Sequence, residues 1–445
     1  MTMINTFDRR DIETRFPELL HRTRWQRFGA PLVIIGTMFY VLYAVWFFNL
    51  PKLVNEAHGE RFGVYLLQWV SYDVQPQFRV KDNGTIDIRY PRFSVLGDDP
   101  KQPDWIKTEA DGSYTVNMAD GVHIARDATV VNAHGTSLTI KTSGTAPAVV
   151  GTPPGWVSAT ADNVQVDLGL SGWLSIDANR VKVVKRFFGW PNFIFDPTSL
   201  FFGKPTGEVV SLIVSGDRID PGQSNLSLAF DNFWNNSTWQ HGDVWTKLFQ
   251  TIVMAFLGTL LGAVVGFPLA FLAARNITPN RFLNAFLKRV FDFMRSVDML
   301  IWGLFLTRAF GPGPLSGSGA IFLMEVGSLG KLYAEALENI DNKPREGIRS
   351  VGASPIAVQR YGVLPQVMPV FAGQTLYQWE SNIRGATIIG AIGAGGIGLK
   401  IWEAMRTKDN WQNVAYMVLL LLIVVYVFDM ISNKLRSVIV GEKLV

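Results

Sequence analysis

Charged residues inside apolar segments are the residues of this 445-residue chain best suited to do chemistry. Glu380 and Arg384 are four positions apart, and Arg295 and Asp298 are three apart, so each pair would share one face of a helix. A charge placed in hydrocarbon is costly and usually faces a partner charge or a water-filled cavity. Two interpretations stay open: a pair only locks helices together, or it lines a path for a polar solute.

Other chemistries find little support. Residues 393–398 match G-x-G-x-x-G, but no βαβ unit surrounds them, and residues 327–331 lack the full spacing of a phosphate-binding loop. The chain has no cysteine, which excludes disulfides, metal–thiolate sites and thiol catalysis. We therefore expect no catalytic residue, no metal site and no cofactor in this chain. The histidines show no ligand spacing and are expected at the surface or in loops: His21, His58, His123, His134 and His241.

Long apolar segments indicate a membrane protein. Phe28–Leu50 is an uncharged run of 23 residues and Leu248–Ala274 one of 27, and about 20 residues suffice to cross hydrocarbon. Arginine is concentrated in residues 1–27 and near the stretch 345–360, and such clusters favour the cytoplasmic side. Further spans are expected at about 289–310, 315–337, from 361 onward and at 410–428.

The resulting topology has six spans. It places the tails 1–27 and 438–445 in the cytoplasm and residues 51–240 outside. The apolar, glycine-rich run 385–399 is either re-entrant or the end of a long fifth helix. Counting it as a separate crossing would move the C-terminal lysines outside, so we reject that arrangement.

The region outside the membrane shows the pattern of strands. Ile86, Ile88 and Tyr90 alternate with polar residues, and similar alternation recurs up to Lys185. Asparagine–glycine and aspartate–glycine pairs, with a weaker His134-Gly135 pair, indicate tight turns. We expect a β-rich extracytoplasmic domain at about 70–185. Two groups of aromatic residues follow this domain. The first group is expected either at the membrane surface or in the core of the β domain: Phe187, Phe188, Trp190, Phe193 and Phe195. The second group is expected at the membrane surface: Phe230, Phe233, Trp234 and Trp239.

A polar stretch, 341–365, lies between two apolar segments. Pro344 suits the first turn of a short helix, and Gly352 can take the left-handed conformation that ends it. Ser354 followed by Pro355 predicts the start of a second short helix, which Gly362 and Pro365 would close. The two helices form either a compact knob for a partner protein or a solvated linker.

This stretch resembles the EAA loop of ABC-importer permeases. Glu346, Gly352, Leu364 and Pro365 fall at matching spacings, whereas Gly347, Ile348 and Gly362 depart from the consensus. Residues 382–398 and 258–276 resemble segments of permeases for phosphonate and related phosphorus oxyanions, and residues 329–341 lead into the loop as they do there. The resemblance covers roughly residues 245 to 437, and the β-rich region is not part of the usual family pattern.

The resemblance implies a mostly α integral membrane protein, a type I ABC-importer-like bundle of about six transmembrane helices with an inserted β-rich domain. Residues 241–437 would be the permease domain of a bacterial inner-membrane importer of phosphonate or a related phosphorus oxyanion. The implied partners are two cytoplasmic ATP-binding subunits, which hold ATP and Mg²⁺, an identical second permease chain and an extracytoplasmic solute-binding protein.

The resemblance also implies roles for particular residues. The residues expected to couple to the ATPase are Glu346, Gly347, Arg349, Gly352, Ala353, Ser354, Pro355, Leu364 and Pro365. The charged pairs within the spans, together with the segment 382–398, lead us to expect a translocation path or gate formed by Arg295, Asp298, Glu380, Asn382, Arg384, Gly393, Gly395 and Gly396.

Two other functions are compatible with parts of the sequence. An ion-coupled secondary transporter of a small anion fits the interrupted run 385–399, but no internal repeat is visible and the EAA spacing would go unexplained. A membrane-anchored receptor with a β ectodomain would not need charged residues in five further spans.

Overall fold

A computed structural model describes residues 24–56, 59–81, 84–91, 94–97, 100–142, 146–407 and 411–440. The chain divides into two compact units, Met1–Tyr65 and Leu66–Val445. The first unit contains helices α3 (Arg24–Phe47) and α4 (Leu50–Glu56) and the start of α5 (Gly59–Val70). Within α3, Phe28–Phe47 is long and apolar enough to cross a membrane, as the sequence predicts for the first span. Most of the arginine-rich tail lies outside the described residues.

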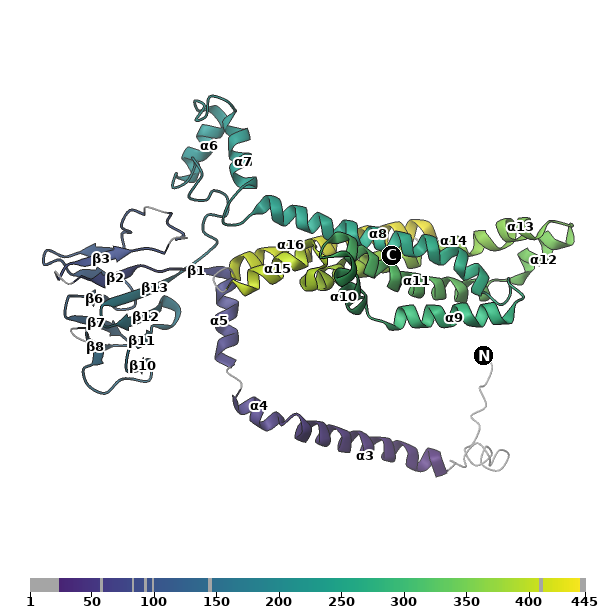
Figure 1. The fold of residues 1–445 in the computed structure, drawn as a ribbon, viewed down its shortest axis with the longest axis horizontal. Helices are drawn as coiled ribbons and strands as arrows, with labels where there is room; N and C mark the ends of the chain where they lie inside the picture. Colours follow the sequence, from purple (N-terminus) through teal and green to yellow (C-terminus); the bar gives the residue numbers. More distant parts are fainter. Residues whose placement is uncertain are drawn as a thin grey trace, which may run out of the picture. The chain divides into compact units, whose positions relative to one another are not determined.

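The second unit begins with two antiparallel sheets (Figure 1). Side chains from both sheets, among them Phe78, Ile140 and Leu174, are buried in one core, so the sheets pack face to face. The predicted β-rich region is confirmed. One sheet contains β1 (Ser71–Val74), β2 (Gln77–Val80), β3 (Ile86–Arg89), β10 (Val157–Ala159), β11 (Val164–Asp167), β12 (Gly172–Asp177) and β13 (Arg180–Phe188). The other contains β4 (Ile106–Thr108), β5 (Tyr114–Val116), β6 (Val122–Ile124), β7 (Ala128–Ala133), β8 (Thr136–Lys141) and β9 (Ala148–Val149).

Local sequence explains the register of these strands. In β11, Val164 and Val166 are buried and pair with Ile176 and Leu174 of β12, whereas the alternate residues Gln165 and Asp167 are exposed. His134 and Gly135 have φ of 52° and 71°, the two positive values that a two-residue hairpin turn requires. The weaker of the predicted turn signals therefore joins β7 to β8.

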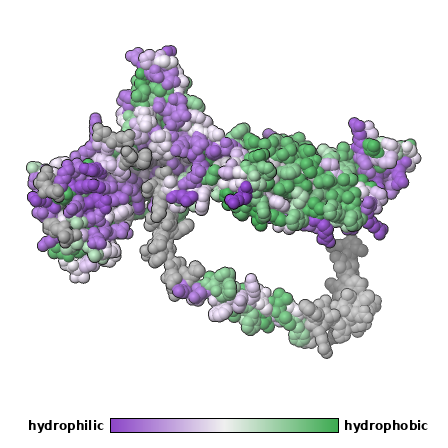
Figure 2. All heavy atoms as spheres, in the orientation of Figure 1, coloured by the Kyte–Doolittle hydropathy of each residue, from purple (hydrophilic) through white to green (hydrophobic). Residues whose placement is uncertain are grey.

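The rest of the second unit is helical. Figure 2 shows that most of the helical bundle has an apolar surface. His241–Ala273 and Trp411–Ile439 are apolar and long enough to span a membrane, and a pair of helices bent by 58° forms a further broken span or re-entrant loop. The helices are α6 (Thr206–Ser215), α7 (Asn225–Trp234), α8 (His241–Ala273), α9 (Arg281–Ser296), α10 (Met299–Phe310), α11 (Pro314–Glu338), α12 (Asn342–Ser350), α13 (Pro355–Val358), α14 (Leu364–Ile389), α15 (Gly396–Arg406) and α16 (Trp411–Val440).

Glycines hold α8 close to α11. Gly258, Gly262 and Gly266 are four positions apart and face α11 along one side of α8. A Cβ atom added at Gly262 would lie 2.5 Å from the Cβ atom of Glu325, so only glycine fits. Stripes of small residues at this spacing let membrane helices approach closely.

The predicted third span, 289–310, is wrong as a single helix. The chain breaks between α9 and α10, because Asp298 caps the second helix: its Oδ1 accepts the Leu300 N–H at 2.8 Å. Arg295 lies at the end of α9 and pairs with Asp292 at 3.4 Å. The expected Arg295–Asp298 pair on one helix therefore does not form.

The expectation that every histidine is at the surface or in a loop is wrong for His241. This first residue of α8 is fully buried, with Nδ1 2.8 Å from Tyr416 Oη and Nε2 2.7 Å from the Phe193 carbonyl oxygen. Trp190 and Trp239 pack in the same cluster. Trp190 and Phe193 are thus not core residues of the β sheets, because they pack against the first turns of α8 and α16.

Candidate functional site

Helices α12 and α13 form a knob, here defined as residues 341–363, at one end of the bundle (Figure 1). Asp341 caps α12, since its Oδ1 accepts the Lys343 N–H at 3.0 Å. Ser354 caps α13, since its Oγ accepts the Ala357 N–H at 3.3 Å. Gly352 lies between the helices with φ of +81°, the left-handed conformation that the sequence predicts. The predicted cap of Ser354 and the predicted left-handed bend at Gly352 are thus confirmed.

The knob exposes apolar side chains in a polar setting. Val351 is 81% exposed, Ile356 is 80% exposed and Tyr361 is 63% exposed. Exposed apolar side chains grouped within a polar segment mark an interaction surface more often than a solvated linker. The predicted coupling residues all belong to this end of the bundle. Those that are exposed are Glu346, Gly347, Arg349, Gly352, Ser354, Pro355 and Pro365, while Ala353 and Leu364 are partly buried.

The second short helix does not end at Gly362 and Pro365, contrary to expectation. The chain continues through a wide turn, η2 (Gln359–Val363), into α14, and the Leu364 N–H bonds to the Gln359 carbonyl oxygen. Pro365 falls in the first turn of α14, where a missing N–H is tolerated. Gly362 serves packing, because a Cβ atom there would lie 3.1 Å from Arg345 Cα in α12.

The Glu380–Arg384 pair forms on α14 as predicted. Arg384 Nη1 donates to Glu380 Oε1 at 2.7 Å. Only 10% of the Glu380 side chain is exposed, against 50% of the Arg384 side chain. The positively charged Arg384 guanidinium therefore lies at the surface of the bundle, and the buried Glu380 carboxylate accepts its hydrogen bond from the inside.

Arg384 belongs to a seam of exposed or partly exposed side chains along α14. The seam residues repeat every seven positions in two rows, which is the spacing of a surface that packs against another helix. They are Val370, Tyr377 and Arg384 in one row and Gln374, Ser381 and Ile388 in the other. Arginine and glutamine on a membrane helix usually face protein or water rather than lipid. The seam is therefore suited to a subunit contact or a water-filled path.

Asn382 points away from this seam. It is 2% exposed, and its Nδ2 donates to Glu325 Oε1 at 2.8 Å and to Thr259 Oγ1 at 2.9 Å. These three side chains join α8, α11 and α14 inside the bundle. Glu325 is fully buried, and its Oε2 has no hydrogen-bond partner among the described residues. Glu325 was not predicted as a site residue, although a single carboxylate in an apolar stretch was the signal that could have identified it.

Three glycines break the helix after α14. Gly393, Gly395 and Gly396 have φ of 104°, 86° and 71°, values that favour glycine. A Cβ atom at Gly396 would lie 2.4 Å from Thr251 Oγ1 of α8, and this oxygen accepts the Ile397 N–H at 2.8 Å. The glycines therefore let the chain turn tightly against α8 before α15 begins. The break excludes a straight fifth helix through 385–399 and leaves a broken span or a re-entrant loop.

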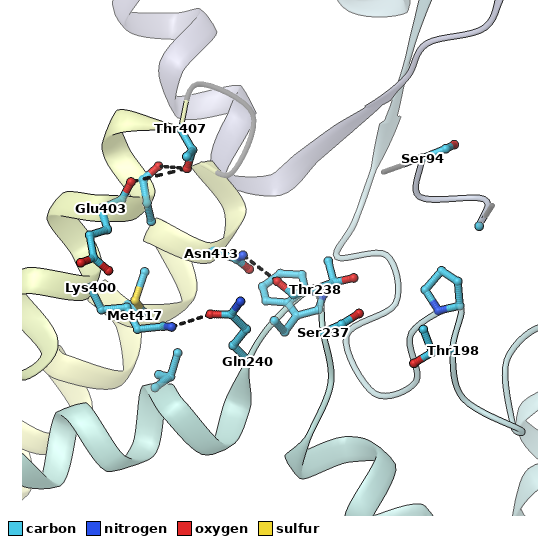
Figure 3. Close-up of a pocket in the computed structure, with 15 residues that line it drawn as sticks. Ser94, Thr198, Ser237, Thr238, Gln240, Lys400, Glu403, Thr407, Asn413 and Met417 are labelled. Atoms are coloured by element: carbon cyan, nitrogen blue, oxygen red, sulfur yellow. Dashed lines mark hydrogen bonds between the residues drawn. The ribbon is translucent and has the colours of Figure 1, made fainter. Parts of the chain in front are cut away.

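A pocket of about 590 Å³ lies near the start of α8 and beside α15 (Figure 3). Lys400 Nζ contacts Gln240 Oε1 at 2.5 Å and pairs with Asp243, so its charge is balanced. Glu403 also lines the pocket, which thus has no surplus of positive charge. Hydroxyl and amide groups supply the remaining polar lining: Ser94, Thr198, Ser237, Thr238, Thr407 and Asn413. The polar lining is therefore close to neutral and offers no concentrated positive charge to an anion.

Asp196 fixes the loop that forms one wall of this pocket. The carboxylate is buried and accepts the Ser237 N–H at 2.6 Å, the Thr198 N–H at 3.1 Å and the Thr198 hydroxyl at 2.7 Å. Burial raises the pKa of Asp196, but these hydrogen bonds lower it, and the resulting pKa lies below the usual value for aspartate. Elsewhere in the described residues, no three acidic or histidine side chains are grouped to hold a metal ion.

Comparison with known proteins finds relatives of the helical part of the chain. Residues 266–439 match the family described as "Binding-protein-dependent transport system inner membrane component". The chain is 39% identical over 190 residues to the phosphite transport system permease protein PtxC of Stutzerimonas stutzeri, which covers 43% of this chain and 69% of that protein. The matched family region contains the knob, the seam and the helix break, whereas the two sheets precede it.

Two further relatives are named for transport of phosphonate and of phosphate. The chain is 47% identical over 118 residues to the putative cryptic phosphonate transport system permease protein PhnE2 of Escherichia coli strain K12, covering 26% of this chain and 96% of that protein. It is 35% identical over 195 residues to the phosphate-import permease protein PhnE of Mycolicibacterium smegmatis, covering 44% and 36%.

Proposed function

This chain belongs to the family of binding-protein-dependent transport system inner membrane components, and we propose that it is the permease subunit of an ATP-driven importer of a phosphorus oxyanion. ATP hydrolysis takes place in a separate subunit. The observation that carries the proposal is the knob, a rigid pair of capped helices inside the family region with exposed Val351 and Ile356.

The knob is the contact for the ATPase. Its helices have fixed ends and a fixed bend, so a push on the knob is transmitted to α14 through the continuous turn η2. Two cytoplasmic ATP-binding subunits, each holding ATP and Mg²⁺, would engage the knobs of two permease chains. Closure of the ATPase pair on ATP would then tilt α14 and open the path alternately to each side.

The seam of α14 is the path-facing surface. Two identical chains would bring their seams together, and each would contribute one Arg384 half neutralised by Glu380. An anion crossing a low-dielectric region needs compensating positive charge, but a fully unpaired arginine would hold the anion too firmly. The Glu380–Arg384 pair thus attracts the anion without binding it tightly. Gly393, Gly395 and Gly396 would allow the end of this path to open and close.

The substrate class follows from the names of the relatives. These are a phosphite, a phosphonate and a phosphate transport protein, whose solutes share a tetrahedral phosphorus atom with anionic oxygens. We assign this chemistry to the chain without choosing among the three. An extracytoplasmic binding protein would deliver the solute on the side of the pocket beside α15, with residues 51–240 outside and both tails in the cytoplasm of a bacterial inner membrane.

Crosslinking tests the proposed contact. Ile356→Cys, in a chain that has no other cysteine, is expected to form a crosslink with a co-expressed ATPase of the same transport system. Leu315→Cys is a matched control, because it is 73% exposed, close to the 80% of Ile356, but lies at the opposite end of α11 from the knob. A crosslink from Leu315→Cys with none from Ile356→Cys would contradict the assignment of the knob.

A further inference from the structure

Helix α7 exposes large apolar side chains on a face that its own hairpin does not cover. Leu226 is 65% exposed, Phe230 is 63% exposed and Trp234 is 37% exposed. They are spaced four apart and therefore form one stripe, here called the α7 stripe. The other side of α7 is already covered, because Leu228 and Ala229 are buried against α6. An exposed stripe of this size on a short helix calls for a covering surface.

The α7 stripe is continuous with the exposed apolar surface of α8. A Cβ atom at Gly242 would lie 2.6 Å from the indole of Trp234, so the stripe ends on the first turn of α8. Trp245 and Phe249 follow Gly242 on the same helical face and are 41% and 64% exposed. Because α8 is long and apolar enough to span a membrane, these side chains mark the level where it leaves lipid.

The charges of the hairpin indicate which surface covers the stripe. Residues 204–235 contain two basic and four acidic residues, so attraction to anionic lipid or to an acidic partner does not assist binding. An aromatic and aliphatic stripe on a short helix is suited to the boundary between headgroups and acyl chains. Figure 2 shows apolar surface on this hairpin as well as on the bundle.

We propose that α7 lies in the membrane interface at the end where α8 begins, with Leu226, Phe230 and Trp234 inserted among the lipids. The occupant of the stripe is lipid, not a soluble binding protein and not a second copy of the chain. The hairpin would then fix the segment between β13 and α8 at the membrane surface. This inference does not depend on which solute is transported.

Spin labelling of the full chain in phosphatidylcholine nanodiscs tests the proposal, since a chain without cysteine accepts one label at a chosen position. Leu226→Cys and Phe230→Cys report on the stripe. Ser227→Cys and Asp231→Cys are matched controls, because each is an exposed polar residue that follows a stripe residue by one position, about 100° further around the helix. Collision rates of each label with oxygen, which concentrates in lipid, and with a water-soluble nickel chelate are compared.

Labels at 226 and 230 are expected to collide more with oxygen than with nickel, and labels at 227 and 231 more with nickel. Added phosphatidylglycerol should leave this contrast unchanged, because the hairpin is acidic. Higher nickel than oxygen collision at 226 and 230 would show a stripe in water and overturn the proposal. Low collision rates with both reagents would show that protein covers the stripe, and this result would also overturn the proposal.

Discussion

Arg384 and Asn382 are two residues apart on α14, yet their side chains enter different surroundings. Arg384 is half exposed on the seam, whereas Asn382 is buried and binds Glu325 and Thr259. Both residues were expected in a translocation path, Arg384 as a charge within an apolar span and Asn382 as part of the segment 382–398 that resembles phosphonate permeases. Only the three-dimensional packing of α8 and α11 against α14 separates a surface arginine from an internal amide.

Exchanging the charges of the Glu380–Arg384 pair distinguishes a path from a helix lock. In the double variant Glu380→Arg with Arg384→Glu, the negative charge moves to the half-exposed position and the positive charge to the buried one. We predict that assembly with the ATPase is retained and that uptake of the anion falls to background. Near-normal uptake in the exchanged variant, measured beside an Arg384→Lys control, would assign the pair to structure alone.

Asp196 provides a prediction about pH. Its folded-state pKa is lower than its unfolded-state value, so its hydrogen bonds stabilise the fold above pH about 4 and this contribution is lost as the pH falls through the folded pKa. Asp196→Asn is expected to lower the unfolding free energy by about 1–3 kcal/mol at pH 7, because one oxygen that accepts two donors is replaced.

Thermal unfolding of the purified chain at several pH values measures this effect. The difference between Asp196→Asn and the parent chain should shrink as the pH is lowered below about 4, because the Asp196 carboxylate is protonated there first in the unfolded chain and only at a lower pH in the folded chain. A difference that stays constant from pH 7 down to pH 3 would show that ionised Asp196 does not fix the loop.

At the scale of elements, the bend at Gly352 is the feature on which coupling depends. Gly352→Val places a β-branched residue at φ of +81°, which is strongly disfavoured, so the knob should deform and transport should uncouple from ATP hydrolysis. Gly207→Val is a matched control, because a Cβ atom also has open space there and the backbone is helical, but the residue lies in α6 and not in the knob. Uptake and solute-stimulated ATPase activity should be lost in the first variant and largely kept in the second. Equal retention in both would remove Gly352 from coupling.

Local signals predicted the elements well where the physics is local. Caps such as Ser354, the left-handed Gly352 and the alternation in β11 need only their sequence neighbours, and each appears in the structure. The break before Asp298 was not predicted, because the apolar residues around it suggested one continuous span although Asp298 is a helix-capping residue. The burial of His241 was not predicted, because its partners Phe193 and Tyr416 are distant in sequence.

At the scale of the whole molecule, the sidedness of the chain can be tested by labelling. Ala110→Cys lies on an exposed loop between β4 and β5, and Ser350→Cys lies on the exposed knob. A thiol reagent that does not cross membranes should label Ala110→Cys in cells with a permeabilised outer envelope and label Ser350→Cys only after the inner membrane is opened. The reverse order would place the sheets in the cytoplasm.

The central claim is that this chain carries a phosphorus oxyanion with energy from a separate ATPase. The most direct measurement is uptake of radiolabelled phosphite, phosphate or methylphosphonate into proteoliposomes that contain the permease, its ATPase and its binding protein. We predict that uptake of at least one of these anions requires hydrolysable ATP on the knob side and continues when ionophores collapse all ion gradients. Uptake that persists without ATP and disappears with the gradients would contradict the account and identify an ion-coupled transporter.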